Sequence, residues 1–143
     1  MPQANDAELT ELYTTALNVN VENDEPNAQI GAPANTFNLR LQAVAGNVIG
    51  GGGGNYTLRA DCIDETLAAR NGGMSLDPVN QAFNNAPGND WTLTADGSFV
   101  KEQTAVITRD PGAAGHVFRY VGSLVSANGD VVSFIESNKF IML

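Results

Sequence analysis

The chain has 143 residues, of which 43% are hydrophobic, and it carries 16 acidic against 7 basic residues, for a net charge of −9. This length suits a single domain, residues 1–143, that can bury about two-thirds of its unfolded surface without disulfides. The shortage of lysine and arginine argues against nucleic acid and anionic membranes as partners, because both are bound through clustered cations.

Cysteine usage and the first residues bear on the compartment. Cys62 is the only cysteine, so no disulfide forms within the chain. Residues 1–20 lack the positively charged and apolar regions of a signal peptide, and no run approaches the ~20 apolar residues of a membrane span. The 16 asparagines and 15 glycines beside only two lysines favour a secreted or surface-exposed protein.

The N-terminal segment mixes two periodicities. Five apolar residues recur at helical spacing: Leu9, Leu12, Tyr13, Ala16 and Leu17. With Asp6 as a cap, they predict a short helix or an irregular arm over about residues 1–14. Alternation of apolar and polar residues then predicts a strand from about Thr15 to Val21, followed by a loop over residues 22–34.

Two alternating segments flank a glycine tract. Residues 37–43 and 56–62 place apolar side chains at every second position, which predicts two strands with one buried face each. Gly50 to Gly54 between them predict the flexible tip of a hairpin, and shortening such a tip should leave stability unchanged or slightly raised. The tract is not a phosphate loop, because neither the Lys-Ser/Thr of that motif nor a helix follows it.

The middle of the chain breaks the strand pattern. Asp64 is a suitable N-cap for a helix over residues 65–70, and Asn71-Gly72 would end it. Asp77-Pro78 predicts the start of a second short helix that runs to about Asn84. We therefore expect one or two short helices around residues 64–84, between two regions of sheet.

Strands resume in the C-terminal half, over residues 91–95, 98–108, 117–126, 131–136 and 139–142. Asp96-Gly97 and Asn128-Gly129 lie in two of the gaps, and such pairs favour tight hairpins whose two central residues both have positive φ. In total about eight strands and two small helical turns predict an antiparallel β-sandwich, immunoglobulin-like or jelly-roll in type.

The second of these hairpins carries apolar residues on both faces. We expect Phe118, Tyr120 and Leu124 to face inward from its first strand. Opposite them we expect one of two sets, either Val132 and Phe134 or their neighbours Val131 and Ile135. The second apolar face predicts a central hairpin, or one covered by the N-terminal arm or an oligomer partner. Phe134→Ala should then cost about 3–5 kcal/mol.

Two acidic clusters are the candidate metal sites. Glu22, Asp24 and Glu25 share one loop, and a second cluster consists of Asp61, Asp64 and Glu65. Calcium takes six to eight oxygen ligands. Neither cluster has the spacing of a helix-loop-helix calcium site, so solvated surface charge is favoured, and calcium at the first cluster stays open. One histidine and one cysteine supply too few ligands for a transition metal.

Candidate catalytic residues are few. His116 is the only histidine, and Ser123, Ser126 and Ser133 on nearby strands lie outside a nucleophile turn. Cys62 is in phase with buried residues, which predicts an inert thiol. Trp91 could be a binding platform, although core packing is favoured. The sequence therefore assigns no catalytic, cofactor-binding or metal-ligating residue.

These observations favour a non-enzymatic binding or protein-interaction module, with a protein or a glycan as partner, because loops on a rigid sheet are common recognition sites. One alternative is a self-assembling structural component, such as a virion or surface-layer protein, whose edge strands pair with neighbours. The other is a small carboxylate-dependent hydrolase, because the separation of two carboxylates in space cannot be seen in a sequence.

Overall fold

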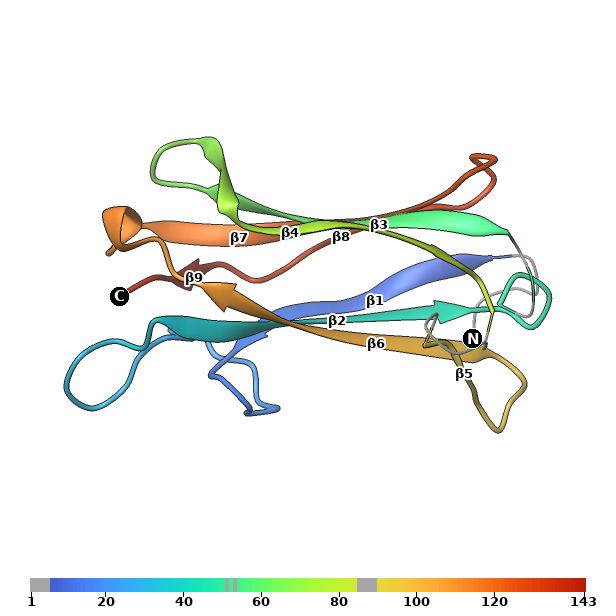
Figure 1. Ribbon diagram of the computed structural model, residues 1–143, viewed down its shortest axis with the longest axis horizontal. Coiled ribbons are helices and arrows are strands. Elements are labelled where there is room, and N and C mark those ends of the chain that lie inside the picture. The colour runs from blue at the N-terminus through green and yellow to red at the C-terminus, as the bar shows by residue number, and fades with distance from the viewer. Residues whose placement is uncertain (1–5, 51, 53, 85–89) are drawn as a thin grey trace.

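The computed structural model describes residues 6–50, 52, 54–84 and 90–143, which form two antiparallel sheets packed face to face (Figure 1). In chain order the elements are β1 (Ala7–Thr15), β2 (Thr36–Ala45), β3 (Asn55–Asp64), β4 (Ala69–Ala82), β5 (Thr92–Leu93), β6 (Phe99–Thr108), the 3₁₀ turn η1 (Pro111–Ala113), β7 (Val117–Ser126), β8 (Val132–Glu136) and β9 (Phe140–Ile141). The predicted β-sandwich is confirmed.

The two sheets have the strand orders β1-β2-β6-β5 and β4-β3-β7-β8, and β9 continues along β7 beyond the end of β8. β1 and β8 lie beside each other at one side of the sandwich, and β4 lies opposite β6 at the other side. Within the described residues, no helix has the length and apolar character needed to cross a membrane.

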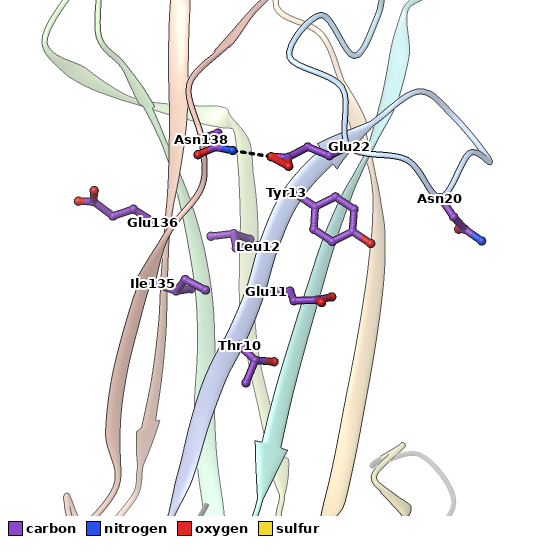
Figure 2. Close-up of a pocket in the computed structure, with 9 residues that line it drawn as sticks. All are labelled: Thr10, Glu11, Leu12, Tyr13, Asn20, Glu22, Ile135, Glu136 and Asn138. Atoms are coloured by element: carbon purple, nitrogen blue, oxygen red, sulfur yellow. Dashed lines mark hydrogen bonds between the residues drawn. The ribbon is translucent and has the colours of Figure 1, made fainter. Parts of the chain in front are cut away.

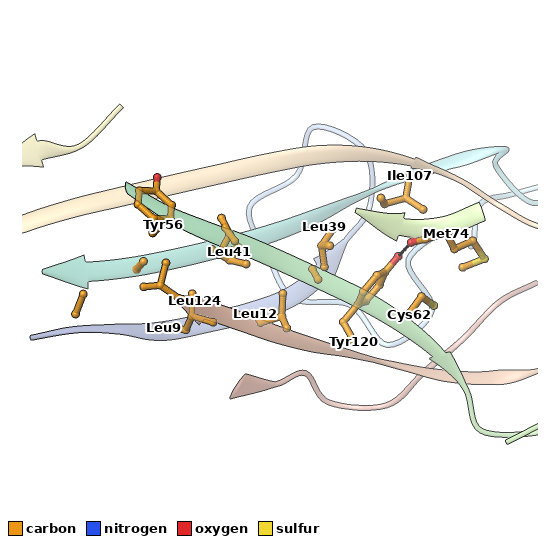
Figure 3. Packing of buried hydrophobic residues seen from close by; sticks show 14 of the residues in the cluster. Leu9, Leu12, Leu39, Leu41, Tyr56, Cys62, Met74, Ile107, Tyr120 and Leu124 are labelled. Atoms are coloured by element: carbon orange, nitrogen blue, oxygen red, sulfur yellow. Dashed lines mark hydrogen bonds between the residues drawn. The ribbon is translucent and has the colours of Figure 1, made fainter. Parts of the chain in front are cut away.

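The core lies between the sheets and follows from the alternation of side chains along the strands. Every second residue of β7 is buried, from Phe118 to Ser126, while the residues between them are half-exposed. Figure 3 shows the same arrangement for side chains of β1, β2 and β6 on one side and of β3, β4 and β7 on the other. The expectation that Phe118, Tyr120 and Leu124 face inward is confirmed, because each is fully buried.

The helix or arm expected at the N-terminus is instead strand β1 from Ala7 onward. A β-bulge between Leu9 and Glu11 explains the error. The extra residue shifts the phase of the strand, so Leu9 and Leu12 both face the core although they are three positions apart. That spacing imitates a helix. The strand expected over residues 15–21 is also absent, and only one isolated bridge, Thr15 to Glu22, forms there.

The helices expected around residues 64–84 are also wrong, because β4 occupies most of that segment. Oδ1 of Asp64 does accept a hydrogen bond from the N–H of Leu67, at 3.1 Å, but it stabilises a four-residue hairpin turn between β3 and β4. Ala68 has φ 54°, which reverses the chain there. Pro78 lies where the register of this edge strand shifts, a position that tolerates its missing N–H.

The hairpin expected around the glycine tract does not form. β2 pairs with β1 and β6, whereas β3 pairs with β4 and β7, so the chain passes from one sheet to the other between Ala45 and Asn55. Gly50 packs against the ring of Phe99, and a Cβ at Gly50 would lie 2.5 Å from Cδ2 of that ring. Gly51 and Gly53 lie outside the described residues.

The two hairpins of the C-terminal half are confirmed, β5–β6 at Asp96-Gly97 and β7–β8 at Asn128-Gly129. Only the glycine of each pair has positive φ, 87° at Gly97 and 78° at Gly129. The expected turns with two positive φ angles are therefore absent. Each loop is longer than two residues, and one left-handed glycine completes the reversal.

Candidate functional site

An apolar patch covers the outward face of β7 and β8. We call Val121, Val125, Val132 and Phe134 the apolar outer face. Val125 pairs with Val132, and Ser123 pairs with Phe134, so Phe134 lies diagonally beside both valines of β7. Val132 is 54% exposed and Phe134 is 69% exposed, so no described segment covers them.

This finding decides between the two predicted partner sets. Val131 is buried and Ile135 is packed against the core, whereas Val132 and Phe134 face solvent. The cost expected for Phe134→Ala is therefore wrong, because it assumed a buried ring and Phe134 is 69% exposed. β7 is central between β3 and β8, but residues 6–15, the described part of the N-terminal segment, do not cover its outer side, because β1 belongs to the other sheet.

Charged side chains border the apolar outer face. Arg119 lies next along β7 and binds Glu65 and Glu136, the latter at 2.9 Å between Nη1 and Oε1. On β3, Nε of Arg59 lies 3.7 Å from Oδ2 of Asp61. The patch thus has four apolar side chains around Ser123 and a border of both charge signs.

A groove of about 420 Å³ runs between β1 and the β8–β9 segment (Figure 2). Nine residues line it: Thr10, Glu11, Leu12 and Tyr13 from β1, Asn20 and Glu22 from the following loop, and Ile135, Glu136 and Asn138 from the C-terminal segment. Leu12 and Ile135 lie next to each other at its middle. Glu11 and Tyr13 point to the β2 side, and Glu136 points to the opposite side.

Hydrogen bonds fix the ends of this groove, which we call the β1–β8 groove. At one end Nδ2 of Asn138 donates to Oε1 of Glu22 at 2.9 Å. At the other end the N–H of Leu9 donates to Oγ of Ser133 at 2.9 Å. The nine lining residues include three glutamates and no lysine, arginine or histidine. The groove is therefore suited to neutral or cationic groups.

The sequence did not single out this groove, although Glu22 was a candidate calcium ligand. The main chain of Asp24 accepts a hydrogen bond from the N–H of Ile141, and the N–H of Glu25 is held by the side chain of Asn23. These contacts join the loop to the C-terminal segment. In the described part of the chain, no three His, Cys, Asp or Glu side chains gather around a point that could hold a metal.

The second acidic cluster is divided among separate partners. Asp61 pairs with Arg70 at 2.9 Å, Glu65 pairs with Arg119, and Asp64 pairs with His116. Nδ1 of His116 lies 2.7 Å from Oδ2 of Asp64. Burial acts to raise the pKa of Asp64, but hydrogen bonds from His116 and from the N–H groups of Leu67 and Thr66 outweigh it and lower that pKa.

His116 and Asp64 have the arrangement of an oriented base, but the predicted nucleophile candidates lie elsewhere. Oγ of Ser126 bonds Asn128, Oγ of Ser133 bonds the N–H of Leu9, and Ser123 is on the outward face of β7. None of them is hydrogen-bonded to His116. The pair joins the residue before β7 to the last residue of β3.

Cys62 and Trp91 both belong to the core. Cys62 is fully buried, and burial raises the pKa of its thiol to about 12, which favours the unreactive protonated form. Trp91 is 2% exposed and donates a hydrogen bond from Nε1 to the hydroxyl of Tyr56 at 3.1 Å. It also packs against Phe83. The core interpretation of Trp91 is confirmed.

No protein-family model matches the chain, and no characterised protein matches it at a significant level.

Proposed function

We propose that this chain is a non-enzymatic protein-interaction module, which docks a partner protein on the apolar outer face. The exposure of Val132 and Phe134, at 54% and 69%, is the observation that carries the proposal. An antiparallel sheet with one solvated face normally places polar residues there. Two neighbouring apolar positions on β8, backed by two valines of β7, favour burial by a partner instead.

The composition of the patch supports a specific partner. Aromatic residues are enriched at the centres of interfaces, and charged residues usually lie at their rims. In the apolar outer face, Phe134 is the aromatic residue, and the Arg119–Glu136 and Arg59–Asp61 pairs form the charged rim. Two copies of the chain would each bring a net charge of −9. Their mutual repulsion favours a different protein as partner over self-assembly.

Photo-crosslinking tests the proposal. A photoreactive phenylalanine analogue at position 134 should capture a defined protein from the source cells, whereas the analogue at position 104, on the exposed outer face of β6, should not. The captured protein is then purified, and its binding to the chain is measured by calorimetry. Phe134→Ser should weaken that binding at least about tenfold, the loss typical of an interface hot spot, while Thr104→Ser should leave it unchanged.

Two results would contradict the proposal. One is equal capture from positions 134 and 104, and the other is unchanged binding by Phe134→Ser. Light scattering after size exclusion separates the self-assembly alternative, because a dimer that Phe134→Ser dissociates would identify a second copy as the partner.

A further inference from the structure

We propose that the β1–β8 groove binds a short extended peptide segment with basic side chains, which adds as a strand to β1 opposite Leu12. This site is distinct from the apolar outer face, although Glu136 borders both, because it lies between the edges of β1 and β8 and not on the outward surface of β7 and β8. The proposal therefore does not depend on the proposed function.

The edge of β1 that faces the groove is the first argument. In an antiparallel ladder, successive residues direct their N–H and C=O alternately to one neighbouring strand and to the other. The C=O of Thr14 accepts from the N–H of Asn23, so Thr14 directs its main chain away from β2. The register is continuous from Glu11 to Thr15. Leu12 therefore also directs its N–H and C=O away from β2, into the groove.

The neighbours of Leu12 along this edge have protein partners. The N–H of Leu9 donates to Ser133, and the loop around Glu22 and Asn23 bonds to Thr14 and Thr15. Among the described strands, none pairs with β1 on this side. Leu12 as a whole is 5% exposed, and main-chain groups at a buried position require hydrogen-bond partners. An extended peptide supplies an acceptor for the N–H of Leu12 and a donor for its C=O.

The side chains around this edge define the peptide. Its residue opposite Leu12 would point inward, toward Leu12 and Ile135, and should be apolar. Its two neighbours would point outward, beside Glu11 on β1 and near Glu136 and Glu22. Because no lining residue is cationic, these neighbours should be lysine or arginine. The pattern basic-apolar-basic follows from the alternation of a strand.

Titration of the full chain with a capped tripeptide, acetyl-Lys-Val-Lys-amide, which is short enough for the edge between Leu9 and Thr14, tests the site by amide chemical shifts. We expect saturable shifts at residues 10–13 and 135–138. The same peptide with Glu in place of both Lys should give none. N-methylation of the valine removes its donor to the C=O of Leu12 and should weaken binding about tenfold, near the upper range for one hydrogen bond.

A pair of variants on β1 tests the role of charge. Glu11→Gln should weaken peptide binding about two- to fivefold, the range of one exposed ion pair. Glu8→Gln makes the same charge change on the same strand outside the groove lining, so it should have no effect. Phe134→Ser should also leave peptide binding unchanged, because it alters a separate surface.

Three results would overturn the proposal. They are shifts outside the groove, equal binding of the N-methylated peptide, and equal weakening by Glu8→Gln and Glu11→Gln. Glucosamine, a cation without a peptide backbone, serves as a further probe. If it produces the same saturable shifts as the lysine peptide, the groove recognises a cationic sugar and strand addition is excluded.

Discussion

Nδ1 of His116 lies 2.7 Å from Oδ2 of Asp64, and this hydrogen bond joins the residue before β7 to the last residue of β3. The other oxygen of the same carboxylate accepts from the N–H of Leu67 and holds the β3–β4 turn. One buried carboxylate therefore fixes the turn and the histidine together.

The first prediction concerns the contribution of the Asp64 carboxylate to stability at neutral and at acidic pH. The folded state lowers the pKa of Asp64, so its stabilisation is present above the unfolded pKa of about 3.9 and is lost as pH falls through the folded value. Asp64→Asn should lower the free energy of unfolding by about 1–3 kcal/mol at pH 7. Urea unfolding near pH 3 should show a smaller difference. Exposed Asp77→Asn is the control, and an equal effect of both variants would contradict this account.

The two strands of the β7–β8 hairpin should respond differently to loss of a phenylalanine. Phe118 is fully buried, so Phe118→Ala should lower the free energy of unfolding by about 3–5 kcal/mol. Phe134 is 69% exposed, and Phe134→Ala should change it by no more than about 0.5 kcal/mol. Chemical unfolding of both variants checks the assignment of faces. A large loss at Phe134 would show that the isolated chain buries it.

Substitution by alanine should destabilise the fold at one glycine of the tract and not at another. A Cβ at Gly50 would lie within 3 Å of three atoms of the Phe99 side chain, so Gly50→Ala should destabilise by about 1–3 kcal/mol. Gly52 has open space around the added carbon, and Gly52→Ala should be near neutral. Thermal unfolding compares the two. Equal effects would mean that Phe99 can move aside.

Alkaline pH should destabilise the fold through its buried thiol. Burial raises the pKa of Cys62 from 9.0 to about 12. Between these values the unfolded chain releases a proton that the folded chain retains, so the stabilisation present below pH 9 is lost as pH rises. The free energy of unfolding should fall between pH 8 and pH 10, and the fall should be shallower in Cys62→Ala. The same slope in both proteins would assign it to other groups.

The loop that carries Glu22, Asp24 and Glu25 provides a further test. A metal bound only by the folded state would raise its stability in proportion to the logarithm of free metal concentration. Because no metal-ligating cluster is formed by the described residues, calcium and EDTA should both leave the melting temperature unchanged. A melting temperature that rises with added calcium would restore the calcium interpretation of this loop.

Strand positions were largely predictable because alternation is a local signal, as residues 117–126 and 131–136 show. The hairpin turns at Asp96-Gly97 and Asn128-Gly129 were located correctly, because their residue pairs are a local signal too. β1 and β4 were not predicted as strands, because each contains a register shift and an extra residue breaks the alternation that identifies a strand. The pairing of strands that are far apart in the sequence was not predictable either. β2 and β3 are neighbours in sequence, yet each pairs with a strand from the C-terminal half.

The candidate sites depend on contacts that no local pattern contains. The β1–β8 groove brings Glu22 to Asn138, 116 positions apart in the chain. The apolar outer face could not be recognised from the composition of residues 131–136, because Val131 and Ile135 fit one phase of a strand and Val132 and Phe134 fit the other. Either phase fits a buried face, and only packing against β1 selects the first.

The pairing of β2 with β6 and of β3 with β7 also determines how the chain can fold. Each sheet is joined at its centre by strands from opposite halves of the sequence. The first four strands alone offer only the β1–β2 and β3–β4 pairs, and two-stranded units are marginal in water. Neither sheet can form early, so folding should be slow, in the millisecond-to-second range of non-local β topologies. Until β6 and β7 are synthesised, one edge of β2 and one edge of β3 have no strand to pair with.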